Sequence, residues 1–199
     1  MYQSPHLEVH LYSENTKGLS EIYNLEINRF KNEPSIMVFA HDDIFILDYF
    51  WMHSILNSLS HFGIVGVAGN TKRAPMQASW CFLDEKFTWD APENLIGVIG
   101  HGSSFPPTVL SDFGPPFQAV KLLDGVFLAA YSETLIKANI CFDEQFNFHF
   151  YDMDFCRQAE AKGILMGTIP LSLIHESVGN PSTDSWDQAY KKYLKKWKQ

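Results

Sequence analysis

The sequence predicts one α/β domain, with a mostly parallel central sheet flanked by helices. Short apolar runs alternate with amphipathic stretches along the chain, as in an α/β sheet. The run at 36–40 is apolar without interruption, which is typical of a parallel strand buried on both faces. The 199 residues, of which 46% are hydrophobic and 19% charged, suffice for a core without disulfide bonds. We therefore expect a single domain over residues 1–199.

The first 30 residues predict a strand followed by a helix. Residues 6–12 alternate, with Leu7, Val9 and Leu11 on one face, as in a half-buried strand. Polar residues at 13–16 can cap a following helix. Apolar side chains then recur at 3.6-residue spacing, at Leu19, Ile22, Tyr23, Ile27 and Phe30.

The next stretch predicts two buried strands around a helix. The apolar run at 36–40 forms the first strand and stops at a polar triplet. Asp48 opens the helix, which places Met52, Ile55, Leu56 and Leu59 inward. Residues 64–68 form the second strand, which we expect to end at Gly69 and Asn70.

Residues 71–119 form a loop-rich region with several prolines and one expected strand at 95–99. A long irregular region inside a compact domain is usually functional. Its aromatic residues Trp80, Trp89 and Phe105 have two interpretations: they stack on sugar rings or they fill the core.

Regular patterns return in the last third of the chain. Residues 120–123 and 126–130 predict strands, and a helix follows from Ser132. A helix over about 152–162 ends at Gly163, and residues 164–174 supply one or two strands before His175.

The C-terminal segment 184–199 predicts an amphipathic helix with an aromatic stripe and many lysines. A basic amphipathic helix can lie weakly on an anionic membrane surface. Packing of the stripe on the helix's own domain is the favoured alternative.

Charge and cysteine content limit the partners and the compartment. The formal net charge of −8 argues against a nucleic-acid partner, which requires a basic surface. Three widely separated cysteines form no paired motif and favour a reducing compartment. The first 20 residues lack the apolar core of a signal peptide, and no apolar stretch is long enough to span a bilayer. We expect a soluble, cytoplasmic protein.

The triplet His41-Asp42-Asp43 directly follows the most apolar run. In open α/β sheets, ligands bind beyond the carboxyl ends of the strands. Two carboxylates and an imidazole at such a position can hold a divalent cation, and the carboxylate oxygens suit Mg²⁺ or Mn²⁺. The alternative is a solvated turn.

Asp152 and Asp154 stand at the start of a predicted helix, where carboxylates are favoured in any case. Residues two apart on a helix point about 200° away from each other. One of the two can therefore be catalytic while the other has a structural role. His175 follows an apolar strand, and taken alone it is an ordinary loop histidine, as are His101 and His149.

Together these segments resemble the family 2 glycosyltransferases of GT-A fold. The resemblance covers about residues 7–180 and is closest to a bacterial branch with a His-x-Asp variant of the Asp-x-Asp motif. The segments that carry it are the triplet at 41–43, Leu-Asp-Gly-Val-Phe at 123–127, the stretch 142–157, which is the most specific, and Ile-His-Glu-Ser at 174–177.

The resemblance implies a Rossmann-like fold and a role for each matching residue. It also implies sugar transfer with inversion, from a nucleotide-sugar donor (UDP-linked or similar) to a glycan or another hydroxyl acceptor. Asp43 and His175 would bind Mn²⁺ or Mg²⁺, and Asp152 would be the general base. The nucleotide-sugar contacts would be His41, Asp42, Asp124 and Gly125. The acceptor side would consist of His149, Tyr151 and Asp154.

Two departures from the family pattern leave other functions open. About six residues precede the first predicted strand, so the chain is short at its N-terminus and the base-binding strand is missing or replaced. Tyr151 stands where the family has a glutamate. A domain that binds a nucleotide sugar or glycan without catalysis is therefore one alternative. The other is a metallo-hydrolase around His41, Asp42, Asp43 and His175.

Overall fold

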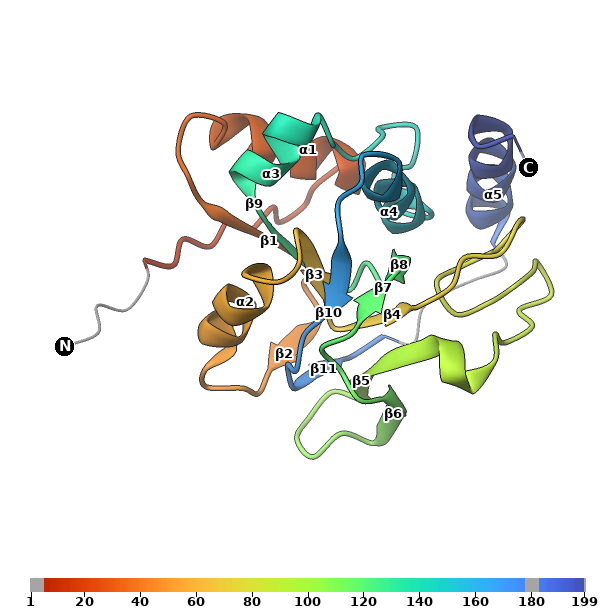
Figure 1. The fold of residues 1–199 in the computed structure, drawn as a ribbon, viewed down its shortest axis with the longest axis horizontal. Helices are drawn as coiled ribbons and strands as arrows, with labels where there is room; N and C mark the ends of the chain where they lie inside the picture. The colour runs from red at the N-terminus through yellow and green to blue at the C-terminus, as the bar shows by residue number, and fades with distance from the viewer. Residues whose placement is uncertain (1–5, 178–182, 199) are drawn as a thin grey trace.

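The computed structural model describes residues 6–177 and 183–198 and gives a mixed α/β fold (Figure 1). Its helices are α1 (Leu19–Arg29), α2 (Trp51–Leu59), α3 (Ser132–Ala138), α4 (Tyr151–Ala161) and α5 (Asp184–Lys196), with a 3₁₀ turn at Pro92–Asn94. Its strands are β1 (Ile36–Ala40), β2 (Ile44–Ile46), β3 (Ile64–Gly66), β4 (Ala68–Asn70), β5 (Leu95–His101), β6 (Val109–Gly114), β7 (Ala119–Val120), β8 (Leu122–Leu123), β9 (Phe127–Tyr131), β10 (Met166–Thr168) and β11 (Leu173–His175).

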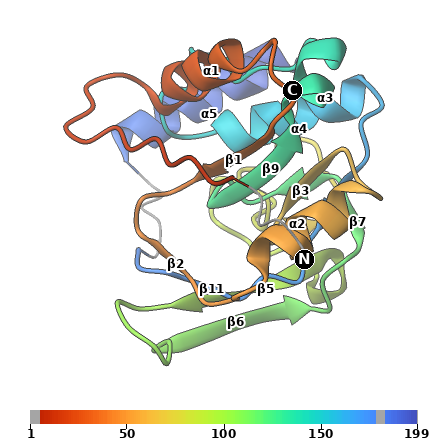
Figure 2. The same ribbon diagram turned by 90° about the vertical axis from the view of Figure 1, so that its left-hand side faces the viewer.

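The strands form two sheets. One has the order β1-β9-β3-β10-β7, and the other has the order β2-β11-β5-β4-β8 with β6 paired to β5. Helices α1, α3, α4 and α5 gather at one end of the molecule, and the β5–β6 hairpin lies at the other (Figure 2). The buried core joins both sheets and includes side chains from β3, β8, β9 and α4.

The prediction of a mostly parallel sheet is wrong for the described part of the chain. Only β3–β10 and β5–β11 pair in parallel, and the other ladders are antiparallel. Strand β1 is at the edge of its sheet and pairs antiparallel with β9, and its Val38 side chain is exposed. An apolar run indicates burial, but it does not encode the direction of the neighbouring strand.

The first predicted strand is also wrong. Residues 6–12 have no regular structure, and Leu7, Val9 and Leu11 are exposed. Alternation produces a strand only where a neighbouring strand supplies hydrogen bonds, and these residues join neither sheet. Helix α1 is confirmed, but its N-cap is Gly18, without a capping side chain from 13–16.

The predicted strand at 64–68 is two strands in different sheets. β3 ends at Gly66, and Gly69 and Asn70 belong to β4 instead of terminating the strand. A Cβ at Gly69 would overlap the Leu122 carbonyl oxygen, so a glycine is required where β4 passes β8. In the loop-rich region, the strand expected at 95–99 is present and continues to His101, whereas β6 was not predicted.

The expected C-terminal helix is present as α5, and Gln199 lies outside the described residues. Its aromatic stripe is buried: Trp186 and Tyr190 pack on Phe150, and Tyr193 packs on Phe146. The structure therefore shows most of the stripe packed on its own domain, which is the favoured alternative to the membrane contact. Within the described ranges, no helix has the length and apolar character that crossing a membrane requires.

Candidate functional site

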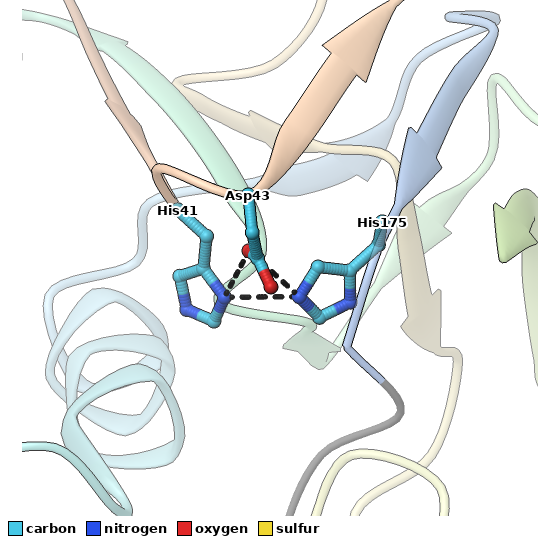
Figure 3. Close-up of side chains that lie close together, drawn as sticks. All are labelled: His41, Asp43 and His175. Atoms are coloured by element: carbon cyan, nitrogen blue, oxygen red, sulfur yellow. Dashed lines mark hydrogen bonds and ion pairs between the residues drawn. The ribbon is translucent and has the colours of Figure 1, made fainter. Parts of the chain in front are cut away.

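Three side chains from distant parts of the sequence converge where β1 and β11 end and β2 begins. His41 follows β1, Asp43 precedes β2, and His175 is the last residue of β11. The antiparallel pairing of β2 with β11 sets His175 opposite Ile44 and so brings His175 beside Asp43. One possible ligand atom from each side chain lies within 4.8 Å of the others. Figure 3 shows the two rings and the carboxylate pointing toward one another.

The contacts within this group leave acceptor atoms free for a cation. His175 Nε2 lies 3.2 Å from Asp43 Oδ1 and 3.3 Å from His41 Nδ1. Ser177 donates its backbone N–H to Asp43 Oδ2 (3.2 Å). The buried Asp43 Oδ1 has no hydrogen-bond partner among the described residues. A carboxylate oxygen without a partner, next to two imidazole nitrogens, is the chemistry of a metal site.

Local electrostatics favour the ligand forms of His41 and Asp43. Burial, followed by the charge of His175, lowers the pKa of His41 despite the nearby carboxylates. Burial would raise the pKa of Asp43, but hydrogen bonds from Ser177 and the charge of His175 lower it overall. A neutral imidazole and an ionised carboxylate are the forms that bind metal. Two nitrogen donors and one oxygen donor suit Mn²⁺ better than Mg²⁺.

Asp152 lies in the first turn of α4 and is half-buried. Its carboxylate accepts backbone N–H groups from Gly125 (3.2 Å) and Met153 (2.8 Å). Burial raises the pKa of Asp152 to about 6, and these hydrogen bonds offset only part of the effect. The group is therefore ionised at neutral pH, but it holds a proton more readily than an ordinary aspartate.

Asp124 lies beside Asp152 in the turn that precedes β9. Its Oδ1 accepts the Val126 N–H (3.0 Å). Burial, followed by the charge of Asp152, raises the pKa of Asp124 to about 7. Neighbouring carboxyl groups with different proton affinities can divide acid and base roles between them.

Tyr151 connects these carboxyl groups to the His-Asp-His group, which consists of His41, Asp43 and His175. Its hydroxyl donates to the Gly125 carbonyl oxygen (2.8 Å) and lies 3.0 Å from His41 Nε2. The Tyr151 side chain is only 3% exposed, which leaves little of it accessible for the predicted acceptor contact. A Cβ at Gly125 would overlap the Tyr151 hydroxyl, so the close approach that this glycine permits is made by Tyr151.

A comparison with known protein families places these residues in a functional context. Residues 12–197 match the model of a family described as glycosyltransferase-like, and the match spans the His41-x-Asp43 motif and all the groups above. The chain belongs to this family 2-like glycosyltransferase family. No curated protein matches the chain at a significant level.

In this glycosyltransferase-family chain, Asp154 has a structural role. It is completely buried, and its Oδ1 accepts from Lys196 Nζ (2.7 Å) and Trp197 Nε1 (2.9 Å), both at the end of α5. This burial and pairing leave no part of Asp154 exposed for the predicted acceptor contact. The opposite directions of Asp152 and Asp154 agree with the helical spacing between them.

The remaining predicted residues differ in how far they are buried. Asp42 is exposed, and His149 is half-buried with its ring against Phe148 (5.1 Å between centroids). Trp80 is buried, and its side chain forms a hydrogen bond with Asp124 and packs on Phe113. Trp80 therefore fills the core. Trp89 and Phe105 are exposed.

Sequence reasoning missed Phe148 and Ser177. The Phe148 ring stacks on His41, with 6.0 Å between centroids and an interplanar angle of 26°, and remains 55% exposed. Ser177 Oγ lies 3.0 Å from His175 Nε2. Phe148 belongs to the aromatic stretch that carried the family resemblance, which is the one signal that pointed to it. Ser177 likewise belongs to the segment 174–177 that carried the resemblance, but no role was assigned to it.

A separate cavity of about 540 Å³ lies between residues 6–12, α1, β1 and α2. Its lining includes neither the His-Asp-His group nor Asp152. The candidate site is therefore identified by its chemistry and not by cavity size.

Proposed function

We propose that the chain transfers a sugar from a nucleotide-sugar donor to an acceptor hydroxyl, with inversion, on a GT-A fold. A divalent cation would be held by His41, Asp43 and His175, with Asp152 as the general base. One observation carries the proposal: three candidate cation ligands meet where β1 and β11 end and β2 begins, and Tyr151 with Gly125 connects them to Asp152. The family match supports the reaction class.

His41 Nδ1, the Asp43 carboxylate and His175 Nε2 would hold the cation. When bound, the cation supplies positive charge for the departing nucleoside diphosphate. The exposed Asp42 would contact the donor nucleotide, and Asp124 would orient the donor sugar. A donor such as a UDP-sugar fits these roles. His149 remains the proposed acceptor contact.

Asp152 would accept the proton of the acceptor hydroxyl as its oxygen attacks the anomeric carbon. The new bond joins that oxygen to the carbon, and the bond from the carbon to the diphosphate oxygen breaks. A pKa of about 6 suits this task, because Asp152 is ionised at pH 7 and still binds a proton in the transition state.

Transfer assays with a panel of nucleotide sugars and Mn²⁺ test this function. We expect turnover that EDTA abolishes. Asp43→Asn and Asp152→Asn should each lower the rate by about 10²–10⁴-fold, because the first removes a cation ligand and the second removes the general base. Asp187→Asn, at an exposed position of α5, is the matched control and should retain full activity.

The two alternatives predict different products. A domain that only binds would take up a nucleotide sugar without turnover, and Asp152→Asn would leave its affinity unchanged. A metallo-hydrolase would release phosphate or a nucleoside monophosphate and form no glycosylated product. Either outcome would contradict the proposed transfer.

A further inference from the structure

The Tyr151 hydroxyl has one proton and two neighbouring groups with which it can form a hydrogen bond. The Gly125 carbonyl oxygen, 2.8 Å away, can only accept a hydrogen bond. His41 Nε2, 3.0 Å away, can donate or accept, depending on which ring nitrogen carries the proton. A neutral hydroxyl donates one proton, so it can serve as donor to only one of the two.

The surroundings of Gly125 decide where that proton goes. Gly125 is buried, and within the described ranges no other hydrogen bond reaches its carbonyl oxygen. If Tyr151 donated to His41 instead, this buried carbonyl would lose its partner, which is costly. Tyr151 therefore donates to Gly125 and accepts from His41. His41 must then carry its proton on Nε2.

This tautomer has a direct consequence at the other side of the ring. A neutral imidazole with a proton on Nε2 has a free lone pair on Nδ1. His41 Nδ1 faces His175 Nε2 (3.3 Å) and Asp43 Oδ1 (4.0 Å). The lone pair is thus directed into the group that could hold a metal ion.

We propose that Tyr151 is a positioning residue that fixes the Nε2–H tautomer of His41 and so presents Nδ1 to the cation. The inference rests on the cation site of the proposed function. It explains why position 125 is a glycine, which leaves room for the Tyr151 hydroxyl. A partner on the second nitrogen is the usual way in which a ligating histidine is oriented.

The packing of Tyr151 fits this role. Its ring contacts those of Tyr23 and Phe142, each with a centroid 6.0 Å away. His175 lacks a comparable constraint on Nε2, because the Ser177 hydroxyl 3.0 Å away can donate or accept. Of the two histidines, only His41 has its tautomer fixed in the metal-free protein, by the Gly125 carbonyl oxygen acting through the Tyr151 hydroxyl.

Nitrogen-15 NMR of the metal-free protein tests the inference without any assay of activity. The spectrum is recorded near pH 8, where an ordinary imidazole is neutral. The His41 signals are assigned by their loss in His41→Gln. We expect wild-type His41 to be almost entirely in the Nε2–H form. Tyr151→Phe should give a mixture of both tautomers.

Metal affinity provides the second measurement. Tyr151→Phe should weaken Mn²⁺ binding, measured by calorimetry, about 10–100-fold. Tyr23→Phe is the matched control: it removes another buried hydroxyl from the same aromatic cluster, one that bonds to the Ala40 carbonyl and not to His41. It should leave the tautomer and the Mn²⁺ affinity unchanged.

The outcomes separate this inference from the proposed function. Wild-type His41 protonated at Nδ1 would overturn the inference without any variant, even if Tyr151→Phe fails to fold. A folded Tyr151→Phe with wild-type tautomer and affinity would also overturn it. Wild-type protein that binds no Mn²⁺ would contradict the cation site, while the tautomer of the metal-free protein would still decide the role of Tyr151.

Discussion

Asp152 is an ionisable group whose burial works against the stability of the fold. Its pKa rises from the ordinary value of 3.8 to about 6, because burial disfavours the charged form. A carboxyl group with a raised folded-state pKa stabilises the fold below its unfolded pKa and loses that contribution as pH rises through about 6. At neutral pH, the folded protein therefore carries an unfavourable charge at the position of the proposed base.

Asp152→Asn should raise stability while it lowers the rate of transfer. At pH 8 we expect its free energy of unfolding to exceed that of the wild type by about 1–3 kcal/mol, since the neutral amide avoids the cost of burying a charge. The difference should vanish near pH 4, where the wild-type carboxyl is protonated in the folded state. Urea unfolding at both pH values measures it.

Asp154→Asn is the matched comparison on the same helix. Asp154 is completely buried, but it is paired with Lys196, so loss of its charge should lower stability at pH 8. If Asp152→Asn also proved less stable at pH 8, the assignment of Asp152 as a carboxylate destabilised by burial would be contradicted.

Helix α5 is attached to α4 by its last turn. Lys196 Nζ lies 2.7 Å from Asp154 Oδ1 and 2.6 Å from Asp143 Oδ2. The Trp197 ring packs under the Arg157 guanidinium, which lies 4.4 Å from the ring centroid. The buried aromatic stripe and this polar contact together explain why the helix packs on its own domain.

Lys196→Met tests the polar part of this attachment. The methionine keeps much of the apolar stem but leaves the buried Asp154 carboxylate without its cation. We expect a loss of about 2–4 kcal/mol in the free energy of unfolding, below the cost for a fully buried pair because Lys196 is partly exposed. Lys192→Met, at an exposed position of the same helix, should change stability by less than about 0.5 kcal/mol. Equal denaturation midpoints for the two variants would show that the ion pair contributes nothing.

The helices were predictable because their signal is local. Apolar spacing located α1 and α5, and the stop at Gly163 located α4, each to within a few residues. Strand pairing depends on distant segments, which explains the errors in the strands. Residues 6–12 alternate but have no partner strand, and β6 pairs with β5 although its mostly exposed side chains gave no apolar pattern.

The candidate site was predictable only in part, for a similar reason. His41 and Asp43 follow an apolar strand, and the rule for strand ends located them. His175 reaches them through the pairing of β11 with β2, which the family resemblance implied and no spacing showed. The bond between Tyr151 and Gly125 depends on how α4 packs beside the turn at 124–126, so sequence reasoning assigned Tyr151 to the acceptor instead.

Over the whole molecule, segments from both sheets and from α4 contribute to one site. β1 belongs to one sheet, β2 and β11 to the other, and α4 supplies Tyr151 and Asp152. The chain therefore builds its site from residues more than 130 positions apart, such as His41 and His175. Such a site requires the complete fold, and it should be lost together with cooperative unfolding.

Diffraction from wild-type crystals soaked with Mn²⁺ and uridine diphosphate tests the central claim most directly. Anomalous scattering locates manganese without prior assumptions about its ligands. The account predicts one manganese peak bounded by His41 Nδ1, the Asp43 carboxylate and His175 Nε2, with the diphosphate on the ion. A peak at other residues, or a diphosphate bound with no ion between these three side chains, would contradict it.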